Sequence, residues 1–150
     1  QGYASSLEPD SDYLLPFGKG NIITSGDELT IVSWGAMVQK TIEAIKSLGL
    51  DEGQIELIDP RTLNPFDLDL IKSSVRKTGK VLIVHEDNIT CGPGAELSAL
   101  ITEQCFEFLD APVNRIGSKN SPIPFHKILE DEILPQIDTI SSKIIELLEY

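Results

Sequence analysis

Basic residues are scarce in this sequence of 150 residues. Lysine and arginine together number 12, against 24 aspartate and glutamate residues, so the formal net charge at pH 7 is −12. Nucleic acids and anionic membrane surfaces are bound mainly by clustered Lys and Arg side chains. The charge balance therefore leads us to expect neither a nucleic-acid partner nor a membrane partner.

Cysteine and histidine are also rare, because the chain contains only Cys91, Cys105, His85 and His126. A structural zinc site needs four Cys or His ligands in closely spaced pairs, which these positions do not offer. Sparse use of cysteine is typical of a reducing compartment, so we expect a cytoplasmic location.

Long apolar runs are missing as well. No run approaches the roughly 18 residues that a membrane span requires, and the sequence does not open with a secretory leader. The first residue is Gln1 rather than Met, which leads us to expect a piece of a longer protein. The apolar fraction of 41% and the charged fraction of 24% are those of a folded domain.

Two kinds of periodicity follow an irregular opening segment. We interpret residues 1–20 as a lead-in or interdomain linker whose apolar side chains lie against a surface, and residues 21–150 as one domain. Short apolar runs predict strands at residues 21–24, 29–34, 54–59, 80–85 and 113–117. Apolar residues at helical spacing predict helices at residues 35–48, 67–78, 94–109 and 137–148.

This alternation of strands and helices predicts an α/β fold. We expect a three-layer α/β/α sandwich around a mostly parallel sheet of about five strands. The link between residues 21–24 and 29–34 is too short for a parallel crossover, so the first strand should be antiparallel and at an edge. Asn64 or Asp67 is expected to cap the following helix, and Gly79 to end it.

Ligands of open α/β sheets bind beyond the carboxyl ends of the strands, and two pairs of residues are predicted there. Asp59 and Arg61 follow one strand; Arg61 is suited to an anion, although a local ion pair with Asp59 is the favoured interpretation. His85 and Glu86 end another strand. His85 is the best candidate for acid–base chemistry, although structural hydrogen bonding at the sheet edge is favoured. His126 would approach His85 only through the fold.

Motifs that bind phosphate or activate a nucleophile are missing. A nucleotide-binding loop needs several spaced glycines, and neither Gly35 nor the pair Gly18 and Gly20 provides such a pattern. A nucleophile elbow needs glycines on both sides of the serine, and Ser33 lacks them. Cys91 precedes a predicted helix start and is a candidate reactive thiol, whereas Cys105 falls in an apolar stripe and is expected in the core. We therefore expect no catalytic, cofactor-binding or metal-binding residue, which favours a structural or interaction domain.

Four segments nevertheless resemble a known family. They are LLPFGKGNIITSGDELTIVSWGAMV (14–38), ELIDPRTLNPFDLDLIKSSVRKTGKVLIVHED (56–87), CGPGAELSALI (91–101) and APVNRIGSKNSPIPFHKILEDEILP (111–135). Their order and spacing resemble the C-terminal domain of the transketolase-like superfamily. The closer resemblance is to the β subunit, or the fused chain, of thiamine-diphosphate-dependent 2-oxo acid dehydrogenases, the decarboxylating first component.

The resemblance implies a parent enzyme that decarboxylates a 2-oxo acid and passes the acyl group to lipoamide. The parent would use thiamine diphosphate and Mg²⁺, but the Gly-Asp-Gly motif and the activating glutamate of the family are absent from this sequence. This chain would therefore bind no cofactor itself and would serve as a scaffold, dimer interface and docking surface. Whether the acyl group is pyruvate-derived or branched-chain is left open, although the His-Glu pair at 85–86 resembles the branched-chain type.

The partners implied are a homodimer or heterotetramer and the small basic subunit-binding domain of a dihydrolipoyl acyltransferase. An acidic surface suits that domain, so the predicted docking residues are Glu130, Asp131, Glu132 and Tyr150; a merely solvated surface is the alternative. The family often has Asp where this chain has Asn120. Two other hypotheses stay open: another superfamily enzyme, such as transketolase or deoxyxylulose-phosphate synthase, and a stand-alone small-ligand-binding domain.

Overall fold

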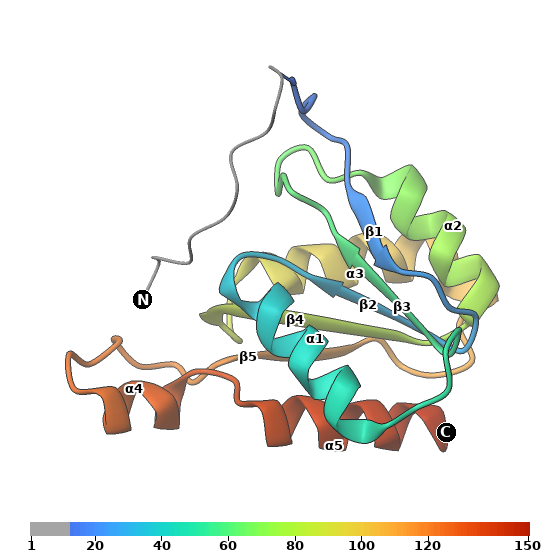
Figure 1. Ribbon diagram of the computed structural model, residues 1–150. Helices are drawn as coiled ribbons and strands as arrows, with labels where there is room; N and C mark the ends of the chain where they lie inside the picture. The colour runs from blue at the N-terminus through green and yellow to red at the C-terminus, as the bar shows by residue number, and fades with distance from the viewer. Residues whose placement is uncertain (1–12) are drawn as a thin grey trace.

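The structure, a computed structural model, describes residues 13–150 and contains a single five-stranded sheet over that range (Figure 1). The strands are β1 (Asn21–Thr24), β2 (Leu29–Ser33), β3 (Ile55–Asp59), β4 (Val81–Asn88) and β5 (Asn114–Ser118). The helices are α1 (Ala36–Leu48), α2 (Leu68–Thr78), α3 (Pro93–Cys105), α4 (Lys127–Ile133) and α5 (Ile137–Leu148). A 3-10 turn, Phe106–Phe108, follows α3.

The strand order is β1-β3-β2-β4-β5. The pairs β2–β3, β2–β4 and β4–β5 are parallel, whereas β1 pairs with β3 antiparallel at the edge of the sheet. The predicted fold class and the antiparallel edge strand are therefore confirmed. A four-residue link lets the chain reverse direction but cannot carry it back along the sheet.

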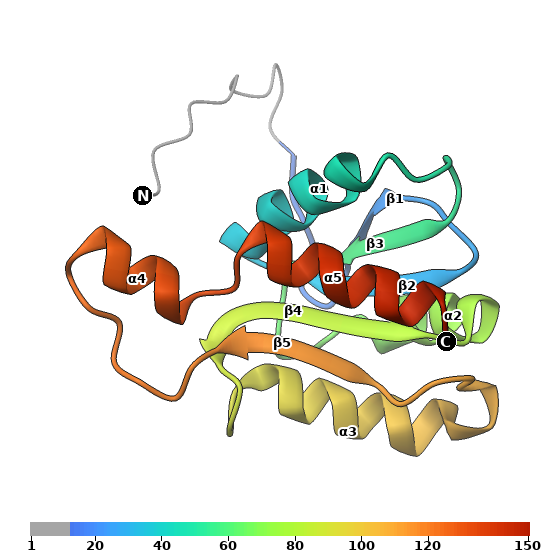
Figure 2. The same ribbon diagram turned by 90° about the horizontal axis from the view of Figure 1, so that it is seen from below.

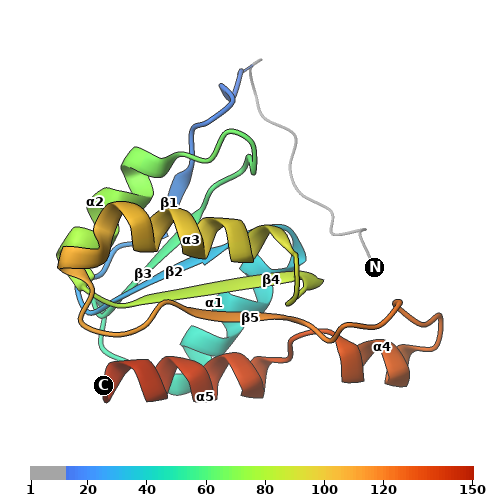
Figure 3. The same cartoon turned by 180° about the vertical axis from the view of Figure 1, so that it is seen from behind.

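Helices cover both faces of the sheet. Figure 2 shows α1 and α5 on one side of β4 and β5 and α3 on the other, and Figure 3 shows α2 beside α3. Alternate residues of β2 belong to two separate hydrophobic cores. Leu29 and Ile31 pack with α1 and α5, while Val32 packs with α2 and α3. The sandwich thus buries every residue of β2, as expected for a central parallel strand.

Helix α2 is fixed by the residues expected to bound it. The Asp67 carboxylate accepts a hydrogen bond from the Leu70 amide, and Gly79 ends the helix in the left-handed conformation. On its buried side, the hydroxyls of Ser74 and Thr78 lie 2.6 Å and 2.7 Å from the Thr30 hydroxyl of β2. These polar contacts satisfy hydroxyl groups that would otherwise be costly to bury.

An ion pair between a buried carboxylate and a half-exposed lysine lies beside these hydroxyls. Glu56 of β3 pairs with Lys77 of α2 and accepts the Gly26 amide at 3.4 Å. Burial alone would raise the pKa of Glu56, but hydrogen bonds from Lys77, Ser74 and Gly26 hold it below its usual value. The carboxylate therefore links α2 and the β1–β2 turn to the sheet.

Three expectations need correction. Strand β4 runs three residues past its predicted end, to Asn88, because Asn88 still pairs with Ser118 of β5. Helix α4 was not expected, since its seven residues present no apolar stripe long enough to be noticed. The apolar side chains of the lead-in that the structure describes do not pack on the domain, because all four are exposed: Tyr13, Leu14, Leu15 and Phe17.

Helix α4 belongs to a projecting segment, residues 119–134, which we call the α4 arm. The figures show it beyond one end of α5, away from the sheet, with the chain terminus at the other end of α5 (Figures 1 and 3). None of the seven helical residues is buried. The arm therefore contributes little to either core.

Candidate functional site

The sheet has one topological switch point, between β2 and β4. From β2 the chain continues through α1 to β3, and from β4 it continues through α3 to β5, so the two connections leave in opposite directions. Ligands of open α/β sheets bind at this place, beyond the carboxyl ends of the strands. Trp34 directly follows β2, and His85 and Glu86 lie in the second half of β4.

Two aromatic rings occupy the switch point. The indole of Trp34 and the imidazole of His85 stack with centroids 5.2 Å apart and an interplanar angle of 1°. His85 is fully buried and Trp34 is 8% exposed. A Cβ atom at Gly94 would overlap Nε2 of His85, and one at Gly117 would lie 2.8 Å from Cε1. Glycine backbone therefore encloses the side of the ring that Trp34 leaves open.

His85 does not make the structural hydrogen bonds that the sequence led us to favour. Neither Nδ1 nor Nε2 has a hydrogen-bond partner in the described chain, because the ring is surrounded by an indole and by glycine backbone. Burial lowers the pKa of His85, and Arg115 lowers it further while Asp87 opposes the shift. In this structure the ring packs as part of the interior, stacked on Trp34.

The other sheet-end candidates lie apart from His85. Asp59 ends β3 and Arg61 lies two residues after it, and strand β2 separates both from β4. The expected Asp59–Arg61 ion pair is not present: the Asp59 carboxylate accepts the Arg61 backbone amide at 2.8 Å, and Arg61 has φ of 57°. That turn carries the guanidinium away from the carboxylate as an exposed group. Glu86 is exposed, and its carboxylate lies near Gly35 at the start of α1.

The remaining candidates do not complete a reactive cluster. His126 is exposed at the start of α4, where its Nδ1 accepts the Ile128 amide at 3.3 Å. Cys91 is exposed, with φ of 62° in the loop before α3. Cys105 is buried as predicted, and burial raises the pKa of its thiol. A thiol with a raised pKa is a poor nucleophile, so Cys105 is a core residue.

The described residues do not fit thiamine diphosphate or its metal. Within residues 13–150 no three His, Cys, Asp or Glu side chains gather closely enough to hold a metal ion. The switch point, where a diphosphate would be expected in such a sheet, is filled by the Trp34–His85 stack. No helix in the same range is long and apolar enough to cross a bilayer.

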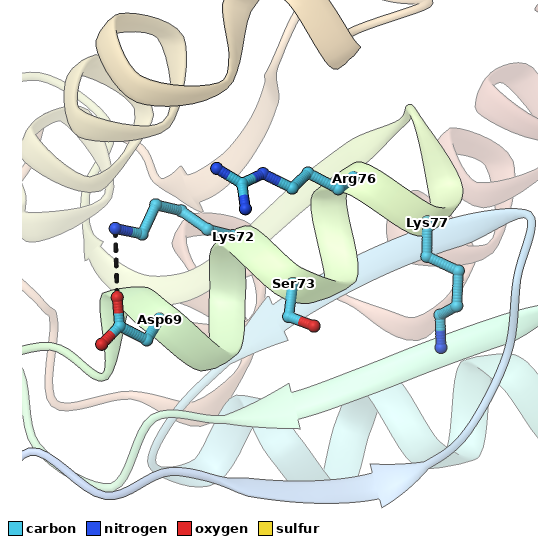
Figure 4. A pocket seen from close by; sticks show the side chains of 5 residues that line it. All are labelled: Asp69, Lys72, Ser73, Arg76 and Lys77. Carbon is cyan, nitrogen blue, oxygen red and sulfur yellow. Dashed lines mark ion pairs between the residues drawn. The ribbon is translucent and has the colours of Figure 1, made fainter.

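A shallow pocket on α2 was not foreseen from the sequence. Figure 4 shows its lining residues, Asp69, Lys72, Ser73, Arg76 and Lys77. Lys72 pairs with Asp69 at 3.1 Å, the Arg76 guanidinium lies 5.1 Å from the centre of the Phe108 ring, and Lys77 pairs with Glu56. Each of these three cations already has a partner, which argues against an anion site in this pocket.

The α4 arm is the most exposed candidate surface. Asp131 and Glu132 are exposed, Glu130 is half-buried, and four large apolar side chains beside them are also exposed: Ile123, Phe125, Ile128 and Leu129. Tyr150 is exposed too, but it lies at the opposite end of α5 from the arm (Figure 2). The predicted docking residues therefore form two surfaces rather than one.

Residues 18–140 match the family described as "Transketolase, C-terminal domain". The chain belongs to this family. It is 37% identical over 140 residues to the β subunit of acetoin:2,6-dichlorophenolindophenol oxidoreductase of Bacillus subtilis, covering 93% of this chain and 41% of that protein. The similarity predicted from the four sequence segments is thereby confirmed.

Two further relatives carry dehydrogenase names. The chain is 39% identical over 142 residues to the pyruvate dehydrogenase E1 component subunit β of Cyanidium caldarium, covering 95% of this chain and 43% of that protein. It is 42% identical over 122 residues to the 2-oxoisovalerate dehydrogenase subunit β of Pseudomonas aeruginosa, covering 81% and 34%. The chain thus spans about two fifths of the length of the curated relatives it matches.

Solved structures show the same fold. A chain described as "Split gene transketolase, inactive beta4 tetramer" superposes with a TM-score of 0.78 over 99% of this chain and 46% of its own length, at 24% identity. Transketolase from Leishmania mexicana superposes with a TM-score of 0.54 over 89% of this chain and 18% of its own length, at 15% identity. At these identities the likeness concerns the fold.

Proposed function

We propose that this chain is the C-terminal domain of the β subunit of a thiamine-diphosphate-dependent 2-oxo acid dehydrogenase. The observation that carries the proposal is the identity of 37–42% to three β subunits, together with the family match over residues 18–140. The cofactor, its Mg²⁺ and the reacting groups would be held by the rest of the parent enzyme. A cytoplasmic location is kept as a prediction, which cell fractionation tests.

In this proposal the domain supplies a scaffold, an assembly interface and a docking surface. The α4 arm suits docking because it combines exposed carboxylates with exposed apolar side chains and gives little to the cores. Interfaces gain affinity from apolar and aromatic groups and on-rate from complementary charge. The partner proposed is the basic subunit-binding domain of a dihydrolipoyl acyltransferase, to which an acidic arm is complementary.

The docking proposal is tested by calorimetric titration of the parent subunit with that domain at low and moderate salt. Replacing Glu130, Asp131 and Glu132 by their amides should weaken binding about 3- to 10-fold and flatten its salt dependence. The matched control replaces Glu96, Glu103 and Glu107 by Gln on the opposite side of the sheet. Equal affinity of the arm variant and the control would remove the arm carboxylates from the interface.

Tyr150 is tested separately because it lies on another surface. Removal of Tyr150 alone should weaken binding only if the partner contacts the far end of α5. An effect of this truncation without any effect of the arm variant would move the proposed docking surface to the chain terminus. Sedimentation of the same variants tests the proposed role in assembly.

The relatives leave two substrate classes for the parent. The dehydrogenase names favour a 2-oxo acid, and the acetoin oxidoreductase, at 37% identity over 140 residues, favours acetoin as a second candidate. Reduction of 2,6-dichlorophenolindophenol by the assembled parent with pyruvate, 2-oxoisovalerate or acetoin separates them. A transketolase or deoxyxylulose-phosphate synthase is not favoured, since transketolases match at 24% identity or less. A stand-alone ligand-binding domain is not favoured either, because packed rings fill the switch point.

A further inference from the structure

The α4 helix cannot depend on its own length or burial. It has seven residues, none of them buried, whereas isolated helices shorter than about 12–15 residues are marginal in water. The carbonyl groups of its last turn also lack partners within the helix. The helix must therefore be held by groups outside it.

The base of the arm is closed by hydrogen bonds at its start. The Lys119 amide donates to the Ile133 carbonyl at 3.1 Å, which joins the two ends of the arm. The Asn120 side chain donates to the Thr90 hydroxyl at 2.8 Å and accepts the Thr90 amide at 3.3 Å. Asn120 therefore has a partner in the loop after β4.

The other end of the arm is held by the amide of Gln136. Its Nε2 donates to the carbonyls of Asp131 and Leu134, both at 2.8 Å. Its Oε1 accepts from Nζ of Lys40 at 3.2 Å, and the same Nζ donates to the Pro135 carbonyl at 3.0 Å. One side chain thus joins the last turn of α4 to a lysine of α1.

Gln136 also begins α5. Its carbonyl accepts the Ile140 amide at 3.1 Å, so the backbone of the same residue starts the helix that packs on α1. Ile140 and Ile144 of α5 are fully buried in the core. The glutamine therefore attaches the exposed helix α4 to a helix that is anchored in the core by its apolar side chains.

We propose that Gln136 and Lys40 are positioning residues that hold the α4 arm in one orientation for its partner. A surface that is ordered before binding loses less conformational entropy when the complex forms. The role in docking rests on the proposed function. The ordering of the free arm by Gln136 and Lys40 does not, and it is measured without any partner.

The test is hydrogen exchange of the free parent subunit, by quench flow, in Gln136→Leu, Gln136→Glu and Lys40→Met. Gln136→Glu keeps an acceptor for Lys40 but loses both donors to the arm carbonyls, so it separates the two halves of the contact. Exchange of the amides of Glu130 and Leu134 should rise about tenfold in both Gln136 variants and less in Lys40→Met. Gln104→Leu and Lys46→Met, at exposed positions of α3 and α1, are the matched controls.

Amides of β4, at Val81 to Val84, report on the sheet in the same experiment. They should exchange at the wild-type rate, because the hydrogen bonds of the Gln136 side chain go to the arm and to Lys40. Unchanged arm exchange in Gln136→Leu, or an equal rise in β4, would overturn the proposal. Titration with the acyltransferase domain then follows: arm exchange that rises without loss of affinity contradicts the docking role and leaves the ordering role standing.

Discussion

The switch point and the α4 arm are opposite in almost every respect. The switch point holds a histidine, the residue type from which acid–base chemistry is usually inferred, yet His85 lies within β4 and is fully buried against Trp34 and glycine. In the arm, by contrast, large apolar side chains are exposed, and hydrogen bonds of Lys119 and Gln136 fix its two ends. Residue type alone therefore does not identify a functional site. The exposure of the side chains and the contacts that hold them in place must be known as well.

Among the substitutions that test this contrast, Trp34→Ala should lower the free energy of unfolding the most. Removal of a buried indole costs about 3–5 kcal/mol of unfolding free energy, since the cavity cannot collapse onto the flat imidazole. Denaturant unfolding measures it. A loss below about 1 kcal/mol, the typical value for any point substitution, would show that the stack is not a principal part of the α2–α3 core.

Gly94→Ala should cost about 1–3 kcal/mol, because its Cβ overlaps the buried imidazole. The loss should shrink in a His85→Ala background, where the ring is gone. A double-mutant cycle by denaturant unfolding gives the coupling between the two positions. If the losses of unfolding free energy in the two single variants simply add in the double variant, the cost of Gly94→Ala does not arise from overlap with the His85 ring.

A smaller effect concerns pH. Because the pKa of His85 is lowered in the fold, the unfolded chain takes up a proton near the ordinary value of 6.5 while the folded chain does not. Stability should therefore be complete above pH 6.5 and fall as pH decreases below it. Glu56, whose pKa is also lowered, adds a loss at lower pH, as pH falls below its ordinary value of 4.5. His85→Phe should remove the first loss and keep the second.

The smallest effect on stability is expected in the arm. Phe125 is fully exposed, so Phe125→Ala should change the unfolding free energy by less than about 0.5 kcal/mol. Binding of the proposed partner should nevertheless weaken, because exposed aromatic side chains are common anchors of interfaces. A stability loss above about 1 kcal/mol would instead place Phe125 in the folding core and end the comparison drawn above.

Much of the sheet could be predicted because burial on both faces leaves nearly continuous apolar runs, as in residues 29–34, and because a four-residue link allows only one direction for β1. The surroundings of His85 could not be predicted, since Trp34, Gly94 and Gly117 come from three separate segments. Helix α4 escaped notice because it owes its form to Gln136 and Lys119 rather than to its own periodicity.

The separation of Glu130–Glu132 from Tyr150 was equally invisible in the sequence. These residues lie within one acidic C-terminal stretch, but α5, a helix of twelve residues, stands between them. Such a helix is about 18 Å long. Proximity along the chain was therefore a poor guide to a shared surface.

The closed base of the arm has a consequence for sequence change. Because the Lys119 amide meets the Ile133 carbonyl, the chain leaves β5 and returns to α5 at nearly the same place. Doubling the length of such a loop costs only about 0.6 kcal/mol in closure entropy. Insertions, deletions and substitutions between these two residues can therefore accumulate while the sheet and its two cores stay unchanged, and a new partner can be acquired without redesigning the domain.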